Sequence, residues 1–280
     1  MEGSNIQTQA EALQGASETL LIPLACRARG SREGVNGFID TESERLAERL
    51  GIDLDRYAVN RSMLLGVIHR GSFFDQRCLD FLNRHPQGTI LNLGAGLNTA
   101  YERMRGRAKV GGWSWIDTDL EPVVALRAQV LEDGEQRRTQ ALDVSDIDAF
   151  RAMLGETQGP LLVISEAVLI YVNAQAVGEI FKAVGDRGDA EFIFDWVSPE
   201  MMRNSRKHPA MKRLRDESVA FASCLRRASD IKNHHANWRI VAETSAPMTR
   251  SGFMPAVMAA VFSVINLGRR IYGCAHARLA

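Results

Sequence analysis

Glycines and acidic residues follow one another at spacings that suit a nucleoside-containing ligand. The segment TILNLGAGLNT (89–99) has the pattern of a short apolar strand that runs into a Gly-Ala-Gly turn at 94–96 and then into a helix. Glycine lets the backbone turn sharply and approach a ligand closely, and amides at a helix N-terminus attract electronegative groups. About twenty residues later, Asp117 and Asp119 end a second strand and could accept hydrogen bonds from ribose hydroxyls. The pattern predicts a bound nucleoside; the alternative is a tight turn without a ligand.

Acids near the ends of the next strands narrow the choice of cofactor. The turn lacks the third glycine of dinucleotide-binding folds, because Thr99 stands there, and this weighs against NAD. Asp143 could receive an adenine amino group and the Val144 amide a ring nitrogen, although Asp143 could equally be the N-cap of the next helix. Glu166 interrupts an apolar strand end, where an unpaired acid is costly, so a cationic α-amino group would suit it. Together these acids favour S-adenosylmethionine.

Alternating apolar runs and helical segments must position these residues. This alternation is typical of βαβ units, in which a parallel sheet is covered by helices on both faces. Helical periodicity precedes it between residues 41 and 85, and residues 1–20 are expected to be frayed. The expected strands are 89–95, 113–119, 140–146, 160–172 and 190–199, with two later ones at 238–245 and 270–279.

Composition and charge exclude several classes of protein. The chain has 280 residues, 45% of them hydrophobic and 24% charged, with a formal net charge of zero, so a strongly electrostatic nucleic-acid binder is not expected. The four cysteines are scattered without a CxxC pair, which excludes a zinc site on paired cysteines and favours a reduced, cytoplasmic setting. The most apolar stretch, 254–267, is shorter than the ~20 residues of a membrane helix and is expected to be core. We expect no secretory signal, no membrane partner and no metal.

The segment between the fifth and sixth strands is basic. Residues 200–237 contain nine Lys or Arg and four Asp or Glu. An insertion at this point lies above the carboxyl ends of the strands, where ligands bind in open α/β sheets. We therefore expect a helical lid over 199–237, in which Arg203 and Arg206 could contact an acidic substrate. The alternative is a solvated helical excursion whose charges do nothing specific.

Several of these segments also carry a family resemblance, in an order and spacing that fit about two-thirds of the chain. They are ETLLIPLACRARG, HRGSFFDQRCLDFLNRHPQGTILNLGAGLNT, WIDTDLEPVVALR, LDVSD and SEAVLIYV. The chain resembles the leucine carboxyl methyltransferase family, and within it the bacterial branch with the tetracenomycin-type polyketide O-methyltransferases. The resemblance implies a single class I, Rossmann-like methyltransferase domain over 1–280, with a seven-stranded, mostly parallel sheet. It divides the chain into an N-terminal helical cap (1–86), a core (87–198 and 238–280) and the lid (199–237).

The resemblance also implies which residues bind S-adenosylmethionine, or its product S-adenosylhomocysteine. Arg70 would grip the carboxylate of the methionine part in a bidentate fork; the alternative is an ordinary arginine on a helix surface. The family commonly reads G-x-D-T-R after the second glycine, where this chain has Asn98 and Ala100, so we carry over the cofactor more firmly than the substrate. The implied cofactor residues are Arg27, Arg70, Asn92, Gly94, Ala95, Gly96, Asn98, Asp117, Thr118, Asp119, Asp143, Val144, Glu166 and Ala167.

The predicted reaction is methyl transfer from the sulfonium to an oxygen of a small, polyketide-like or other secondary-metabolite acceptor. The protein mainly has to position two partners and exclude water. The basic lid favours a carboxylate acceptor, which needs no general base, whereas a phenol or hydroxyl would benefit from one. Candidate bases are Tyr171 and His69, then His208, His234 and His235, and Tyr171 and Trp196 could border the acceptor. The alternatives are an NAD(P)-dependent oxidoreductase and a cofactor-binding protein without catalysis.

Overall fold

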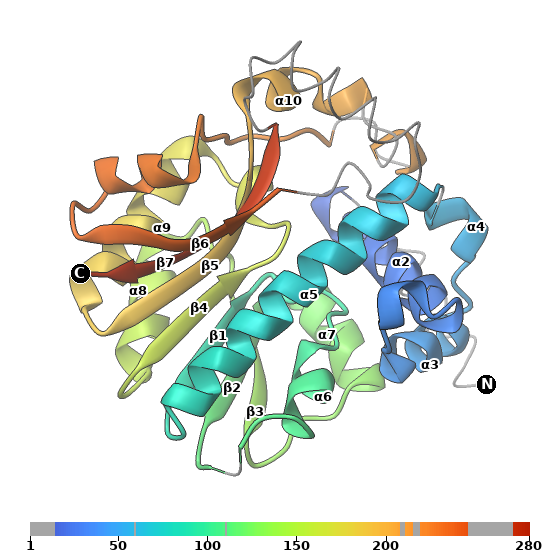
Figure 1. Ribbon diagram of the computed structural model, residues 1–280, viewed down its shortest axis with the longest axis horizontal. Coiled ribbons are helices and arrows are strands. Elements are labelled where there is room, and N and C mark those ends of the chain that lie inside the picture. The colour runs from blue at the N-terminus through green and yellow to red at the C-terminus, as the bar shows by residue number, and fades with distance from the viewer. Residues whose placement is uncertain (1–14, 59, 110, 208–210, 215–218, 246–270) are drawn as a thin grey trace.

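A seven-stranded sheet forms the centre of the computed structural model, in the order β3-β2-β1-β4-β5-β7-β6 (Figure 1). The first five strands are parallel, and β7 lies between β5 and β6, antiparallel to both. The strands are β1 (Thr89–Leu93), β2 (Ser114–Asp119), β3 (Arg137–Ala141), β4 (Leu161–Ser165), β5 (Ala190–Val197), β6 (Trp238–Thr244) and β7 (Tyr272–Leu279). The structure describes residues 15–58, 60–109, 111–207, 211–214, 219–245 and 271–280. The predicted α/β fold class is confirmed.

Helices cover both faces of this sheet, with α8 and α9 on one face and α5 and α6 on the other. Figure 1 shows α5 crossing the front of the sheet from the cap. Helices α2, α3 and α7 share a separate core beside the glycine turn. The helices are α2 (Leu21–Arg32), α3 (Thr41–Arg49), α4 (Leu54–Tyr57), α5 (Arg61–Arg84), α6 (Ala100–Arg105), α7 (Glu121–Val130), α8 (Ile147–Glu156), α9 (Ala174–Arg187) and α10 (Pro199–Arg203).

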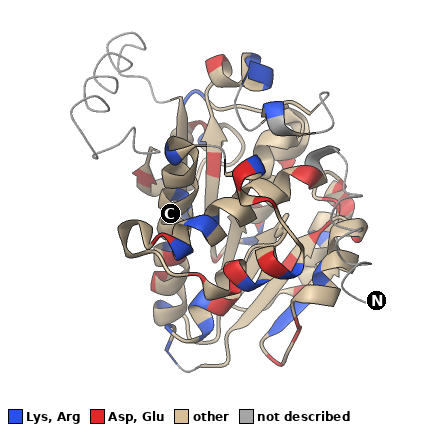
Figure 2. Ribbon diagram, turned by 90° about the vertical axis from the view of Figure 1, so that its right-hand side faces the viewer, with Lys and Arg blue, Asp and Glu red and all other residues tan. Residues whose placement is uncertain are grey.

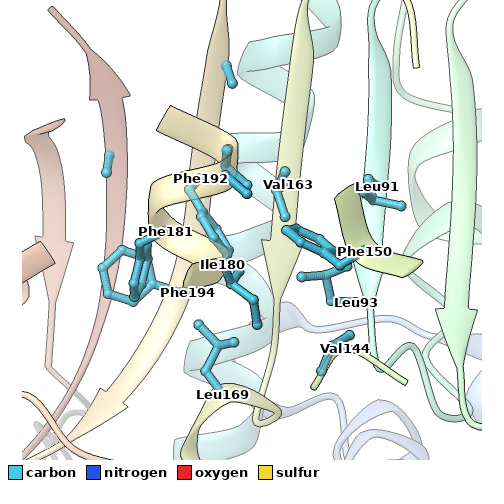
Figure 3. Packing of buried hydrophobic residues seen from close by; sticks show 14 of the residues in the cluster. Leu91, Leu93, Val144, Phe150, Val163, Leu169, Ile180, Phe181, Phe192 and Phe194 are labelled. Carbon is cyan, nitrogen blue, oxygen red and sulfur yellow. The ribbon is translucent and has the colours of Figure 1, made fainter. Parts of the chain in front are cut away.

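The largest core lies between the sheet and α8 and α9, and it is rich in aromatic rings (Figure 3). The Phe181 ring of α9 lies 5.0 Å from each of the Phe192 and Phe194 rings of β5. All eight residues of β5 are buried, as expected for an interior strand covered on both faces. Truncating a buried phenylalanine in such a core costs about 3–5 kcal/mol. This packing fixes the carboxyl ends of the strands, where the candidate site lies.

Short polar side chains divide the helical region 41–85 into three helices. Asp40 accepts the Ser43 amide at the start of α3, Asp53 caps α4, and Asn60 accepts the Met63 amide at the start of α5. Such caps satisfy amides that have no partner within the helix. The long helix α5 ends at Arg84, before the Pro-Gln-Gly sequence that follows it. These caps set the orientation in which α5 crosses the sheet.

The third strand lies three residues earlier than predicted. It spans Arg137–Ala141, and the predicted segment 140–146 is mostly a turn. Asp143 accepts hydrogen bonds from the amide and hydroxyl of Ser145, and this closes the turn. Asp146, not Asp143, caps α8, so the predicted N-cap alternative for Asp143 is wrong. The strand was misplaced because β3 is a polar edge strand, while the apolar residues that follow it belong to the turn.

Two further predictions need correction. The fourth strand ends at Ser165, and the predicted strand residues beyond it form a bend and then the 3₁₀ helix η3 (Leu169–Tyr171). The expected fraying up to residue 20 is wrong for Gly15–Leu20, which forms the 3₁₀ helix η1 with Leu20 buried in the cap. The predicted core segment 254–267 lies outside the described residues.

The expected lid segment lies at the carboxyl ends of β4 and β5. Its elements are α10, η4 (Ser205–Lys207), η5 (Met211–Arg213) and η6 (Ala228–Asn233), and Figure 1 shows α10 at that edge. Ala222 donates its amide to the Ile170 carbonyl and Leu225 donates to that of Val197. Basic and acidic segments are interspersed over the helices in Figure 2. In the described part of the chain, no helix has both the length and the apolar character needed to span a membrane.

Candidate active site

The glycine turn after β1 adopts a conformation that requires glycine. Gly94 and Gly96 have φ angles of 57° and 50°, in the left-handed region. A Cβ atom at Gly94 would lie 2.4 Å from Val168 Cγ2, and one at Gly96 would lie 3.1 Å from Leu20 Cβ. The Ala95 amide donates to the Thr118 carbonyl at 2.8 Å, which ties the turn to β2. The turn is therefore packed between η1 and the segment after β4.

Asp119, at the end of β2, lies directly beside this turn. Its Oδ2 accepts the Gly96 amide at 2.7 Å and its Oδ1 accepts the Leu120 amide at 2.8 Å. Burial raises the pKa of Asp119, and these two hydrogen bonds oppose the rise. Leu120, which the sequence reasoning missed, is 40% exposed and offers an apolar surface next to the carboxylate. The signal was present in the sequence as an apolar residue directly after a strand-end acid.

Asp117 occupies a different environment from Asp119. It is 1% exposed, and its Oδ1 accepts from Asn92 Nδ2 and Trp115 Nε1. Its Oδ2 accepts from Arg127 Nη2 at 2.6 Å and from Arg137 Nε at 2.9 Å. Four protein donors thus occupy this carboxylate and hold it within the sheet–helix interface. Asn92, also predicted as a cofactor residue, is 2% exposed in the same cluster.

Arg127 connects this buried cluster to the glycine turn. Its Nη1 donates to the Gly96 carbonyl at 2.5 Å and lies 3.4 Å from the Asn98 carbonyl. Because Arg127 holds these two carbonyls from the interior of the protein, it fixes the conformation of the turn. Arg127 was not predicted, and nothing in the sequence of α7 distinguishes it from a surface arginine.

Glu166 follows β4 and faces the cap. Its Oε1 accepts from Arg70 Nε and its Oε2 accepts from Asn98 Nδ2, each at 2.9 Å, and Arg27 Nη1 lies 3.9 Å from the carboxylate. Burial alone would raise the pKa of Glu166, but the Arg70 and Arg27 guanidiniums hold it below its ordinary value. The carboxylate is therefore ionised and already partnered within the protein.

Arg70 is held from two sides, by the turn after β4 and by β5 and β7. Its Nη1 donates to Tyr272 Oη at 3.1 Å and lies 3.6 Å from Asp195 Oδ2. The Tyr272 hydroxyl donates to that same Oδ2 at 2.7 Å, and Asp195 Oδ1 accepts the Ala167 amide at 2.8 Å. The Arg70 side chain is 12% exposed, which excludes the alternative of an ordinary surface arginine. Ala167 has a φ angle of 60°, unusual for a residue with a side chain.

Further buried charges lie where α6 meets the cap, and of these the sequence reasoning predicted Arg27 but missed Arg103, Asp40 and Asp75. Arg103 donates from Nη1 to Asp40 at 2.6 Å and from Nε and Nη2 to Asp75 at 2.7 and 2.9 Å. Arg27 is 2% exposed and lies 3.8 Å from Asp40. Arg103 belongs to the same helix, α6, as Ala100, where the family commonly has an arginine. A guanidinium therefore still enters the cap from this helix.

Asp143 and Val144, the residues predicted to bind adenine, lie in the turn after β3, at the same edge of the sheet as Asp119. Leu142 donates its amide to the Asp119 carbonyl at 2.8 Å, which brings the turn after β3 next to the end of β2. Asp143 is exposed, while Val144 is 7% exposed and belongs to the core under α8. The turn thus offers one exposed carboxylate beside a buried apolar residue.

The candidate bases and acceptor residues are less closely grouped. The ring of Tyr171 packs edge-on against Phe221 of the lid segment, and burial raises its pKa. His69 Nε2 lies 2.8 Å from Thr244 Oγ1, and burial lowers the pKa of His69. Trp196 is 3% exposed within the core.

The remaining predicted residues lie elsewhere. His234 and His235 pack against α9, at Gly178 and Gly185, on the face of the sheet opposite α5. Arg203 and Arg206 are exposed, and Arg203 lies 3.6 Å from Glu200. His208 lies outside the described residues. The described geometry therefore brings together the cofactor candidates, whereas His234 and His235 lie on the other face of the sheet.

Comparison with known proteins decides the family. Residues 28–185 match the family model described as leucine carboxyl methyltransferase. The chain belongs to this family. An S-adenosyl-L-methionine-dependent methyltransferase from Gibberella zeae is 29% identical over 197 residues, which is 66% of this chain and 65% of that protein, just under two thirds of its length. The tetracenomycin polyketide synthesis O-methyltransferase of Streptomyces glaucescens is 28% identical over 193 residues, 68% of this chain and 69% of that one.

Solved structures support the fold alone. A proposed methyltransferase from Thermobifida fusca matches with a TM-score of 0.54 at 13% identity, over 91% of this chain and 94% of that one. An S-adenosylmethionine-dependent methyltransferase from Anabaena variabilis matches with a TM-score of 0.50 at 9% identity, over 76% and 85%. The comparisons confirm the predicted family and fold class.

Proposed function

We propose that this member of the leucine carboxyl methyltransferase family transfers the methyl group of S-adenosylmethionine to a carboxylate oxygen of a small anionic acceptor. The observation that carries the proposal is the Arg70–Glu166 pair, which lies next to the glycine turn with Nε and Oε1 2.9 Å apart. An amino-acid group carries one cation and one anion, and this pair offers the complementary charge to each. The names of the two relatives support the same cofactor, and one of them is an O-methyltransferase in polyketide synthesis.

Different residues would bind the ribose and the adenine of the cofactor. Asp119 would accept the ribose hydroxyls, because it lies at the turn and retains exposed surface, whereas Asp117 has four protein donors. Asp143 and the Val144 amide would meet the adenine edge, with Leu120 as an apolar surface. Asn92, Asp117 and Thr118 would then support the turn from within the protein and would not contact the cofactor.

The charge of the site favours a cationic cofactor over a dinucleotide. One linked set of buried charges, between the cap and the ends of β4 and β5, comprises three guanidiniums and four carboxylates, which leaves one excess negative charge if all are ionised. A pyrophosphate would be repelled by this excess, whereas a sulfonium would compensate it. The set is Arg27, Arg70, Arg103, Asp40, Asp75, Glu166 and Asp195.

The protein's part in the reaction is positioning and exclusion of water. When bound, S-adenosylmethionine supplies an already activated methyl group. Tyr171 and Phe221 close the acceptor side by aromatic packing, and burial keeps the Tyr171 hydroxyl protonated, so Tyr171 is a poor general base. A carboxylate acceptor is anionic at pH 7 and needs no base. Arg206, Lys207, Lys212 and Arg226 of the lid segment are exposed and would attract such an acceptor.

Calorimetric titration with S-adenosylhomocysteine, alongside NADH and NADPH, tests the cofactor. Binding of the first alone is expected, and binding of a nicotinamide cofactor would favour the oxidoreductase alternative. A panel of aromatic acids, each matched to its methyl ester and to the corresponding phenol, then tests the acceptor with labelled S-adenosylmethionine. Label that alkaline hydrolysis releases as methanol identifies carboxyl methylation. Label retained as an ether would contradict the carboxylate and favour the phenol alternative.

A further inference from the structure

A chain of three hydrogen bonds links residues far apart in the sequence at the candidate cofactor site. Asp195 on β5 accepts from Tyr272 on β7, Tyr272 accepts from Arg70 on α5, and Arg70 donates to Glu166 after β4. Asp195 is 1% exposed. The role proposed for Arg70 and Glu166 does not account for Asp195 and Tyr272, which lie behind them.

Strand pairing sets the geometry of this chain. β5 and β7 are antiparallel with Val197 opposite Tyr272, so the Tyr272 side chain reaches diagonally to Asp195. Burial raises the pKa of Tyr272, which keeps the phenol protonated as the donor to Asp195 at 2.7 Å. Because its proton is committed to Asp195, the phenol oxygen presents its lone pairs to Arg70.

The Arg70 guanidinium is fixed at two of its three nitrogens. Nε is held by Glu166 and Nη1 by Tyr272, whereas Nη2 forms no hydrogen bond with any residue that the structure describes. A planar guanidinium held at two nitrogens has a fixed direction for the third. The remaining donor edge is therefore oriented before any ligand arrives.

We propose that Tyr272 and Asp195 are positioning residues that orient Arg70, so that its Nη2 donates to the carboxylate of the cofactor's amino-acid part. This inference rests on the proposed function and extends it to two residues at the back of the site. Asp195 has a second effect, because its other oxygen accepts the Ala167 amide and so holds the turn that carries Glu166. The two partners of the amino-acid group are thus aligned through one buried carboxylate.

The test compares two ligands that differ only in the amino-acid part. Tyr272→Phe should weaken S-adenosylhomocysteine about five- to tenfold and leave 5′-methylthioadenosine, which lacks the carboxylate and the amine, within about twofold. Tyr101→Phe is the matched control, because the Tyr101 hydroxyl has no hydrogen bond in the described structure. Its ring packs against Trp113 and Trp115 and lies under the Arg137 guanidinium, and phenylalanine keeps these ring contacts. Equal weakening of both ligands, or unchanged affinity for both, would overturn the inference.

A double-mutant cycle tests whether Tyr272 acts through Arg70. In an Arg70→Met background, adding Tyr272→Phe should not weaken S-adenosylhomocysteine further, whereas independent roles would give additive losses. Asp195→Asn keeps an acceptor for Tyr272 and should recover part of the affinity lost in Asp195→Ala. Additive losses, or no recovery, would contradict positioning. Failure of the unaltered protein to bind S-adenosylhomocysteine would instead overturn the proposed function itself.

Discussion

Single atoms decide the chemistry of the site, as the two acids of β2 illustrate. Asp117 and Asp119 are two residues apart on one strand, yet one has four protein donors and the other borders the glycine turn. Strand-end acids and left-handed glycines leave a local signal in the sequence, so both were predictable. The partners that separate the roles of the two acids come from other strands and from α7, so that separation was not predictable.

Glu166→Gln tests the central residue of the proposed cofactor site. The substitution removes the carboxylate that faces Arg70 and Arg27, and we expect S-adenosylhomocysteine affinity to fall about 10- to 100-fold. Calorimetry measures the change. The matched control is Glu179→Gln, at an exposed glutamate of α9 that pairs with Arg151. Wild-type affinity in Glu166→Gln would remove Glu166 from the site.

Gly94→Ala tests the glycine turn. The added Cβ would meet Val168 at 2.4 Å in a left-handed backbone, so we expect a loss of stability of about 1–3 kcal/mol together with weakened cofactor binding. Gly106→Ala is the control, because Gly106 has a φ angle of −93° and nothing within 4 Å of an added Cβ. Denaturant unfolding of both variants measures the difference. Equal stability of the two variants would contradict the argument.

At the scale of elements, helix α5 and the strands β5 and β7 connect both ends of the sheet. At the edge of the sheet where the parallel strands end, they carry Arg70, Tyr272 and Asp195. At the opposite end of β5, Glu191 accepts from Arg84 of α5 through two nitrogens, and from His276 and Arg278 of β7. One helix is thus fastened to the same two strands at two separate places.

The Glu191 contacts make this part of the fold sensitive to acid. Burial opposes ionisation, but the hydrogen bonds from His276, Arg84 and Arg278 lower the pKa of Glu191 from 4.5 to about 2. Because the folded-state pKa lies below the unfolded one, the stabilisation is complete above pH 4.5 and is lost as the pH falls towards 2. Its size is about 3 kcal/mol. Glu191→Gln should therefore be less stable than wild type at pH 7, with a difference that shrinks by pH 3.

Unfolding free energies measured between pH 7 and pH 3 check this expectation. Glu156→Gln provides the control, since its partner Arg138 and the glutamate are both about half exposed. Ion pairs exposed in this way contribute little to the free energy of unfolding. A pH-independent difference between wild type and Glu191→Gln would show that the ion pairs do not contribute to stability.

The elements also mark where the sequence misleads. The polar edge strand β3 was placed three residues late, because its strand residues are RRTQA and the apolar pair Leu142 and Val144 belongs to the next turn. Interior strands such as β5 were predictable, since burial on both faces produces continuous apolar runs. Asp195 is an acid within such an apolar run, so the sequence could have indicated it as a site residue, as it did Glu166. Tyr272 carried none, because only strand pairing brings it to the site.

At the scale of the molecule, a neutral chain concentrates opposite charges in different layers. The linked set of buried charges between the cap and the ends of β4 and β5 has more carboxylates than guanidiniums, while the lid segment above it is basic. This separation would draw a cationic cofactor inward and an anionic acceptor to the rim.

Replacing three lid cations tests this separation. Arg206→Gln with Lys207→Gln and Lys212→Gln should raise the KM for an acidic acceptor about fivefold or more at low salt, less at 1 M salt, and leave cofactor affinity unchanged. Arg151→Gln with Lys182→Gln, on α8 and α9, is the control. Steady-state kinetics at two ionic strengths measure both. An unchanged KM in the triple variant would support the alternative of a solvated excursion.

The position of β7 has a consequence for the order in which the protein assembles. Residues 272–279 are made after every other strand, yet they form an interior strand between β5 and β6 and bring Tyr272 to Arg70. The contact joins residues 202 positions apart, and such non-local pairings form slowly during folding. In a growing chain that has completed β1 to β6, Arg70 therefore still lacks the contact with Tyr272, although Glu166 has already been made. Cofactor binding becomes a reporter of whether β7 has been made and paired, and a nascent chain stalled before Tyr272 should bind S-adenosylhomocysteine more weakly than one that contains β7.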